Sequence, residues 1–205
     1  VNKMESIAVK DFISEIDGRL ISGSLEDKVN QVSIDSRTIN SGELFFAIEG
    51  ERFDGHDFVR DALNADAIGA VVNNEKADRY DIKSDKLLIG VEDTTQALQD
   101  LAEYYRSLFD IPVIGVTGST GKTTTKDLIA SVLETKFKTL KTEGNYNNEF
   151  GLPLTLFRLD STYEAVVVEL AMRGLGDIET LCQIAQPQIG VVTNVGLTHL
   201  ECLGS

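Results

Sequence analysis

Three short apolar runs constrain the fold of this chain more than any other feature. They lie at Val113–Val116, Ala165–Val168 and Ile189–Val192. Because each run is apolar at consecutive positions, we expect both faces of each strand to be buried, as in a parallel sheet covered by helices on both sides. Helical periodicity separates the runs, so the pattern predicts an α/β fold. Ligands of such sheets bind at the carboxyl ends of the strands, which directs attention to the polar residues after each run.

The 205 residues suffice for one or two domains. In the first part, Leu44–Ile48 and Ala67–Val72 read as strands, and Asp57 is a candidate cap for the helix between them. We place a boundary near residue 88. The prediction is a small mixed α/β domain over residues 1–88, followed over residues 89–205 by a parallel-sheet domain with a phosphate-binding turn.

Composition and charge exclude several classes of function. The net charge of −14 argues against a general basic surface for nucleic acid. No apolar run approaches the ~20 residues that a membrane-spanning helix needs, so we expect no membrane insertion. The first twelve residues carry four charged side chains, which is unlike a signal peptide. The two cysteines form no metal or disulfide pattern, and a reducing cytoplasm is the simplest location.

A glycine-rich turn directly follows the first apolar run. Its Gly121-Lys122-Thr123 sequence lies between a predicted strand and a predicted helix, the context of a P-loop. Backbone N–H groups and the start of the helix would hold phosphates, Lys122 would neutralise them, and Thr123 would ligate Mg²⁺. The usual first glycine of the pattern is replaced by Val116, which leaves a shorter spacing from Gly118. The alternative is a glycine-rich connector with a solvated lysine.

Polar residues follow the other two runs as well. Glu169 ends the second run, where a carboxylate can ligate Mg²⁺, although a strand-end carboxylate facing water is the alternative. His199 follows the third run, but a lone histidine is usually a polar loop residue and an unusual Mg²⁺ ligand. Asn145, Asn147 and Asn148 form a polar cluster that fits either ligand binding or turn chemistry.

Several of these stretches together resemble the Mur ligases of bacterial cell-wall synthesis. They occur in the family's order and span nearly the whole chain, so the resemblance is highly specific. The stretches that carry it are Asp35–Arg37, Gly50–His56, Thr117–Thr124, Glu143–Pro153, Glu169–Ile178 and Asn194–Glu201.

The resemblance implies a role for each matching residue. The first domain would bind a UDP-muramyl substrate and the second would bind ATP and Mg²⁺. The implied nucleotide-binding residues are Gly118, Ser119, Thr120, Gly121, Lys122, Thr123, Thr124, Asn147 and Asn148. The implied substrate-binding residues are Ser36, Arg37, Asp54, Gly55, His56 and Asn145, the implied metal ligands are Thr123, Glu169 and His199, and the implied catalytic residues are Lys122, Glu169 and His199.

Within the family, the Asn-rich stretch and the stretch from Glu169 are most similar to the ligase that adds D-Ala-D-Ala to UDP-N-acetylmuramoyl-tripeptide. The resemblance implies an acyl-phosphate intermediate formed with ATP. It also implies a carboxyl-terminal domain that would lie beyond Ser205. We therefore expect the 205-residue piece to be catalytically inactive or nearly so, and the full-length protein to be a monomer.

Other functions remain open from the sequence. One is a sibling ligase that adds a different amino acid, and another is a relative of folylpolyglutamate synthase, in which no UDP-sugar pocket near Asp35–Arg37 is expected. A non-catalytic module that binds nucleotide or UDP-sugar is a third. A plain P-loop kinase would leave the Asn cluster and the whole first domain unexplained.

Overall fold

The computed structural model describes residues 4–50, 52–82 and 85–196. By internal contacts the chain divides into two units, one ending at Tyr104 and the other beginning at Tyr105. The boundary expected near residue 88 falls inside a strand that pairs with two neighbours in the sheet of the first unit. The sheet of the first unit therefore continues past that position.

The first unit contains a five-stranded sheet in the order β2-β7-β6-β5-β4. Its strands are parallel except for β2, which runs antiparallel to β7 at one edge. The elements of this unit are β1 (Ile7–Ala8), α1 (Val9–Phe12), β2 (Arg19–Ser22), β3 (Lys28–Val29), β4 (Val32–Ser33), β5 (Leu44–Phe46), η1 (Gly55–Phe58), α2 (Val59–Asn64), β6 (Gly69–Asn73), η2 (Asn74–Arg79) and β7 (Leu87–Val91), with α3 (Thr94–Ser107) crossing into the second unit.

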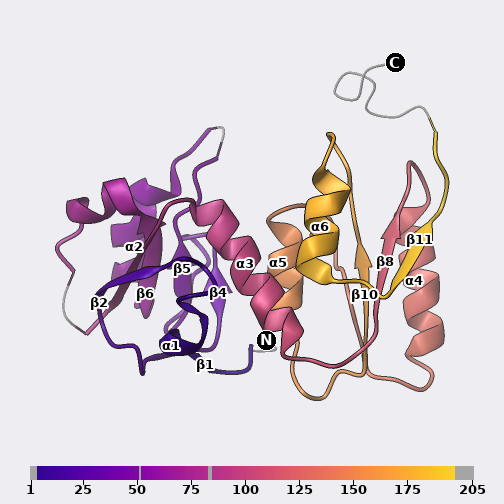
Figure 1. Cartoon of the computed structure of the whole chain (residues 1–205), viewed down its shortest axis with the longest axis horizontal. Helices are drawn as coiled ribbons and strands as arrows, with labels where there is room; N and C mark the ends of the chain where they lie inside the picture. Colours follow the sequence, from indigo (N-terminus) through magenta and orange to yellow (C-terminus); the bar gives the residue numbers. More distant parts are fainter. Residues whose placement is uncertain (1–3, 51, 83–84, 197–205) are drawn as a thin grey trace. The chain divides into compact units, whose positions relative to one another are not determined.

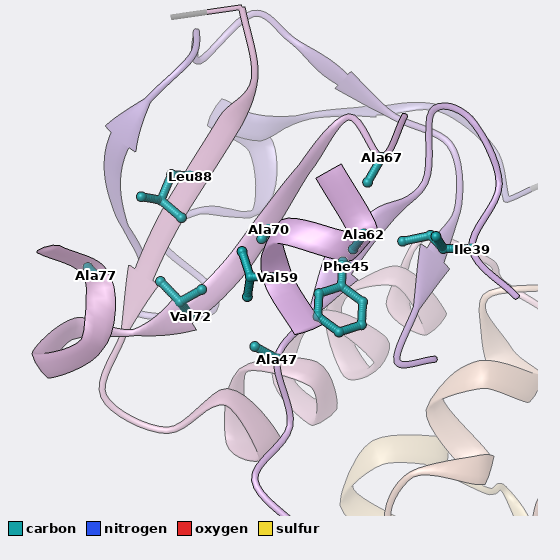
Figure 2. Close-up of a cluster of buried hydrophobic side chains, with 10 residues drawn as sticks. All are labelled: Ile39, Phe45, Ala47, Val59, Ala62, Ala67, Ala70, Val72, Ala77 and Leu88. Carbon is teal, nitrogen blue, oxygen red and sulfur yellow. The ribbon is translucent and has the colours of Figure 1, made fainter. Parts of the chain in front are cut away.

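The core of the first unit forms where α2 packs against this sheet. Figure 2 shows Val59 and Ala62 of the helix facing Phe45, Ala70 and other residues of the strands. Phe45 and Ala70 are paired across β5 and β6, so their side chains lie on the same face of the sheet. The predicted strands at Leu44–Ile48 and Ala67–Val72 are confirmed, although β5 ends at Phe46 and β6 spans Gly69–Asn73.

The second unit contains a four-stranded parallel sheet in the order β11-β8-β10-β9. Helix α4 lies on one side of this sheet, and α5 and α6 lie on the other (Figure 1). Its elements are β8 (Val113–Thr117), α4 (Lys122–Leu133), β9 (Thr139–Lys141), α5 (Gly151–Leu156), β10 (Ala165–Glu169), α6 (Asp177–Ala185) and β11 (Ile189–Val192).

Two of the three apolar runs are buried as predicted. The residues of β10 and the first four of β8 are all buried. The expectation is wrong for β11, where Ile189 and Val192 are more than half exposed. Strand β11 is at the edge of the described sheet and pairs with β8 alone, so its other side has no neighbouring strand among the described residues. An apolar run does not by itself distinguish an edge strand from a central one.

Local capping explains where the longest helix begins. The Asp93 carboxylate accepts hydrogen bonds from the backbone N–H groups of Thr95 and Gln96, at 2.7 and 3.0 Å. These are two of the donors that lack a partner in the first turn of a helix. At 14 residues α3 is too short to cross a bilayer, and no other helix within the described residues is long and apolar enough to do so.

Candidate active site

The glycine-rich turn joins β8 to α4, as the sequence predicts. Gly118 has φ +131° and Gly121 has φ +79°, a region that side chains other than glycine rarely occupy. A Cβ on Gly118 would lie 2.2 Å from the Thr193 hydroxyl, so glycine is also required there by close approach. The Lys122 ammonium folds back and donates to the Gly118 carbonyl at 2.7 Å. The lysine is thus already held over the turn.

The backbone N–H groups of the turn fall into two sets. Those of Lys122, Thr123 and Thr124 belong to the first turn of α4, where no carbonyl of the helix can accept from them. They point along the helix axis at its positive end, an arrangement that binds phosphate. The N–H groups of Ser119 and Thr120 instead donate to the Asn194 backbone and side-chain oxygens, at 3.1 and 3.0 Å. Of the backbone N–H groups that the sequence predicted to bind phosphate, those of Ser119 and Thr120 therefore already have partners within the protein.

A buried carboxylate lies beside this turn. Glu169 is 3% exposed and is the last residue of β10. One carboxylate oxygen accepts from the Thr123 hydroxyl and the other from the Asn147 side-chain amide, both at 2.8 Å. No lysine, arginine or histidine in the described parts of the chain lies within 4 Å of it. A buried anion whose partners here are neutral is an incomplete arrangement, which a cation would complete.

The three clustered asparagines are used in different ways. Asn147 reaches Glu169, and its carbonyl accepts from the Ala171 backbone N–H at 2.9 Å. The Asn148 side-chain oxygen accepts from the Gly151 N–H at 2.8 Å, at the start of α5, which is turn chemistry. Asn145 is exposed. Turn chemistry is thus seen for Asn148, whereas ligand binding by the cluster stays a prediction.

The loop after β11 holds the turn from the other side. Besides the two bonds to Ser119 and Thr120, the Asn194 amide donates to the Thr120 hydroxyl at 2.7 Å. The Thr193 hydroxyl donates to the Thr120 carbonyl at 2.6 Å. The sequence prediction assigned no role to Asn194 or Thr193. Their place directly after an apolar run, at the same sheet edge as Glu169, is the signal that would have found them. His199, predicted as a metal ligand, lies outside the described residues.

In the first unit, the loop after β4 carries Ser36 and Arg37. The Arg37 guanidinium donates to the Asp35 carboxylate at 2.7 and 2.9 Å, although the arginine side chain is 85% exposed. This hydrogen bond is the main reason that the pKa of Asp35 is lowered. Ser36 is half-buried. The loop thus presents the Arg37 guanidinium at the surface, next to the partly buried Ser36.

Asp54 and His56 form a second cluster at the start of η1. Burial alone would raise the pKa of Asp54, but hydrogen bonds from the Lys76 ammonium (2.6 Å) and from the backbone and ring of His56 outweigh it, and the pKa falls to about 2. The Asn73 backbone N–H donates to His56 Nε2 at 2.9 Å, so Nδ1 carries the proton and donates to Asp54 at 2.6 Å. The His56 side chain is 1% exposed. The buried His56 ring therefore stabilises the turn at the start of η1 through these two hydrogen bonds.

Glu49, Asp54 and His56 are close enough together to suggest a metal site, since one ligand atom from each lies within 4.8 Å of the others. The Lys76 ammonium already lies 2.8 Å from the Glu49 carboxylate and 2.6 Å from that of Asp54. A lysine in that position supplies the positive charge that a metal would bring. We therefore interpret this cluster as an ion-pair network.

Two family profiles match this chain. The family profile described as the Mur ligase middle domain matches residues 116–205, and the profile described as the Mur ligase family catalytic domain matches residues 28–106. The chain belongs to the Mur ligase family. The cluster around Asp54 in the first unit and the site around Glu169 in the second unit both lie within the matched ranges.

Curated relatives share substantial identity with the chain. The UDP-N-acetylmuramoyl-tripeptide–D-alanyl-D-alanine ligase of Synechocystis sp. is 44% identical over all of this chain and 44% of its own length. The ligase of the same name from Bacillus subtilis is 40% identical over 96% of this chain and 43% of its own length. The chain thus spans less than half the length of these relatives.

Solved structures give the same result. MurF from Acinetobacter baumannii superposes with a TM-score of 0.86 and 32% identity, over 98% of this chain and 43% of that one. MurF ligase from Thermotoga maritima, crystallised in complex with ADP, gives a TM-score of 0.74 and 39% identity over 83% of this chain and 38% of that one. These comparisons confirm the predicted family and α/β fold.

Proposed function

We propose that this chain supplies the nucleotide-binding and UDP-sugar-binding parts of an ATP-dependent ligase that joins D-Ala-D-Ala to UDP-N-acetylmuramoyl-tripeptide. The observation that carries the proposal is the placement of Glu169 against Thr123, directly beside the glycine-rich turn and Lys122. The names of the curated relatives at 40% and 44% identity supply the substrates. Because ATP and UDP-linked precursors are cytoplasmic metabolites, we place the protein in the cytoplasm.

Magnesium is the cation that suits the buried carboxylate. Mg²⁺ prefers oxygen ligands and usually binds through one or two protein side chains together with phosphate oxygens. The Thr123 hydroxyl and the Glu169 carboxylate, 2.8 Å apart, are such a pair. On this proposal Asn147 keeps the carboxylate aimed at the turn. Bound Mg²⁺ would offset the charge of the terminal phosphates, and His199 stays a predicted second metal ligand.

The chemistry divides into two transfers. A carboxylate oxygen of the tripeptide attacks the γ-phosphorus of ATP, the bond to the bridging oxygen breaks, and ADP leaves. The neutral amine of D-Ala-D-Ala then attacks the acyl carbon, inorganic phosphate leaves with the electron pair of the C–O bond, and the nitrogen gives up one proton, which the departing phosphate takes up. Two anions must approach in the first transfer, so Lys122 and the N–H groups of Thr123 and Thr124 stabilise the negative charge there.

The first unit would hold the UDP-sugar. Ser36 and Arg37 offer a hydroxyl and a guanidinium near the surface, groups that suit diphosphate and sugar oxygens. Asp54 and Gly55 shape the turn nearby, and His56 acts from inside, since both of its ring nitrogens already have partners. Asn145 stays a predicted substrate contact.

The test is phosphate release by the full-length gene product supplied with ATP, Mg²⁺, UDP-N-acetylmuramoyl-tripeptide and D-Ala-D-Ala. We expect release only when both co-substrates are present. Release with a single amino acid in place of D-Ala-D-Ala would indicate a sibling ligase, and release with a folate substrate would indicate the folylpolyglutamate branch. Either result would contradict the proposed substrates.

A further inference from the structure

One buried lysine in the second unit has no part in the site described above. Lys126 of α4 is 3% exposed, and lysine is rarely buried to that extent without a specific partner. Its ammonium donates to the Thr142 backbone carbonyl at 2.7 Å and lies 3.1 Å from the Asp127 carboxylate. Three residues earlier on the same helix is Thr123, so the two side chains project from the same face.

Thr142 connects this lysine to the buried carboxylate. Its hydroxyl accepts from the Glu169 backbone N–H at 3.0 Å, and its own N–H donates to the Val167 carbonyl at 3.1 Å. Thr142 is fully buried and follows Lys141, the last residue of β9. It thus extends the pairing of β9 with β10 to the point where Glu169 leaves the sheet.

Two chains of contacts therefore run from α4 to the same glutamate. Thr123 binds the carboxylate directly, whereas Lys126 acts through Thr142 on its backbone. Asn147, which binds the other carboxylate oxygen, lies five residues after Thr142 in the loop that Lys126 fastens to the helix. Loss of the lysine contact would release the loop that places Asn147 and the hydroxyl that fixes Glu169.

We infer that Lys126 is a positioning residue for Mg²⁺ binding. Through Thr142, Lys126 holds Glu169 and Asn147 in the orientation that the metal requires. The inference rests on the proposed function, because the metal pair of Thr123 and Glu169 is part of it. Groups that orient metal ligands from behind typically change metal affinity by about 10- to 100-fold when removed. Among the residues that the structure describes, no hydrogen bond or ion pair joins Lys126 to the phosphate-binding turn, so its effect should be confined to the metal.

The experiment measures ADP binding to the 205-residue chain by calorimetry, first in EDTA and then across a series of MgCl₂ concentrations. The variants are Lys126→Met, which keeps the length of the side chain, and Thr142→Val, which keeps its shape but removes the hydroxyl. Thr142→Ser retains the acceptor and serves as the conservative variant. Lys136→Met removes the same charge at an exposed position of the same unit and is the matched control.

In Lys126→Met and Thr142→Val, we expect the Mg²⁺ concentration for half-maximal enhancement of ADP binding to rise about tenfold or more, with ADP affinity in EDTA changed by less than about twofold. Thr142→Ser and Lys136→Met should match the unchanged chain. If Lys126→Met does not fold, the comparison of Thr142→Val with Thr142→Ser still tests the inference, because it tests the hydroxyl through which Lys126 acts on Glu169.

Three results would overturn the inference. An unchanged Mg²⁺ midpoint in Lys126→Met or in Thr142→Val would remove it while leaving the proposed function in place, because the inference needs both the contact of Lys126 with the Thr142 carbonyl and the contact of the Thr142 hydroxyl with Glu169. An equal loss of ADP affinity with and without Mg²⁺ would show a general structural role. Failure of the unchanged chain to bind ADP in either condition would remove the proposed function, and the inference with it.

Discussion

Asp54 makes one contribution to the pH dependence of the stability of the first unit. Its pKa falls from 3.8 to about 2, because the hydrogen bonds from Lys76 and His56 outweigh the effect of burial. A group whose pKa is lowered by folding stabilises the protein at pH values above its unfolded pKa, and this contribution disappears as the pH falls through the folded pKa. At 1.36 kcal/mol per pKa unit, the contribution is about 2 kcal/mol at neutral pH, and about half of it remains near pH 3.

The perturbation is Asp54→Asn, which keeps the size of the side chain and removes the charge. We expect the variant to be less stable than the unchanged chain at pH 7, and the difference to shrink by about 2 kcal/mol between pH 5 and pH 2. The assay is urea unfolding followed by far-ultraviolet circular dichroism, since the chain has no tryptophan. Urea is uncharged and leaves the ion pair with Lys76 unscreened, unlike guanidinium.

Taking the difference between the two proteins at each pH cancels the other carboxylates, which titrate in both. Lys76→Met provides a second arm, because it removes the ammonium and should flatten the pH dependence of the Asp54 contribution. If the stability difference between Asp54→Asn and the unchanged chain is the same at pH 7 and pH 2.5, then the network around His56 does not lower the pKa of Asp54 and the reasoning is refuted.

Three further changes test packing and charge. Gly69→Ala would place a Cβ 2.3 Å from the Cβ and carbonyl oxygen of Leu87 on the neighbouring strand, and should cost about 3 kcal/mol of unfolding free energy in urea titrations. Tyr105→Phe removes the buried hydroxyl that donates to the Leu159 carbonyl at 2.6 Å, and the loss should be about 1–3 kcal/mol by the same assay. Glu169→Gln should leave the melting temperature in EDTA the same or higher, because a buried charge is removed, and should abolish the additional stabilisation by Mg²⁺ with ADP.

The sequence predicted the central features of the second unit because they are local. The turn after β8 and the carboxylate at the end of β10 follow from apolar runs, glycine positions and the rule that parallel strands end at one edge. The continuous apolar run of β11 was a poor guide to its burial, because the position of a strand in a sheet depends on pairings between segments that are distant in sequence. Short strands such as β9 gave too few residues for a periodic pattern.

Contacts between segments that are distant in sequence could not be predicted either, because they depend on how the chain folds rather than on a local pattern. Nothing near Lys126 in the sequence indicates that it meets Thr142, and a lysine four residues after Lys122 looks like part of a solvated helix face. The substrate-binding role of His56 stays a prediction, but the sequence did not indicate that both of its ring nitrogens have partners within the protein. Such roles depend on which loops a fold brings together.

The central claim is that the turn from Gly118 to Thr124 binds the phosphates of ATP with Mg²⁺. It is tested most directly by calorimetric titration of Mg²⁺·ATP into the 205-residue chain, its Lys122→Ala variant, and a Lys136→Ala control that removes an exposed lysine of the same unit. We expect a single site in the unchanged chain and in the control, and no measurable binding in Lys122→Ala. Binding of equal strength in all three proteins, or in none of them, would contradict the account.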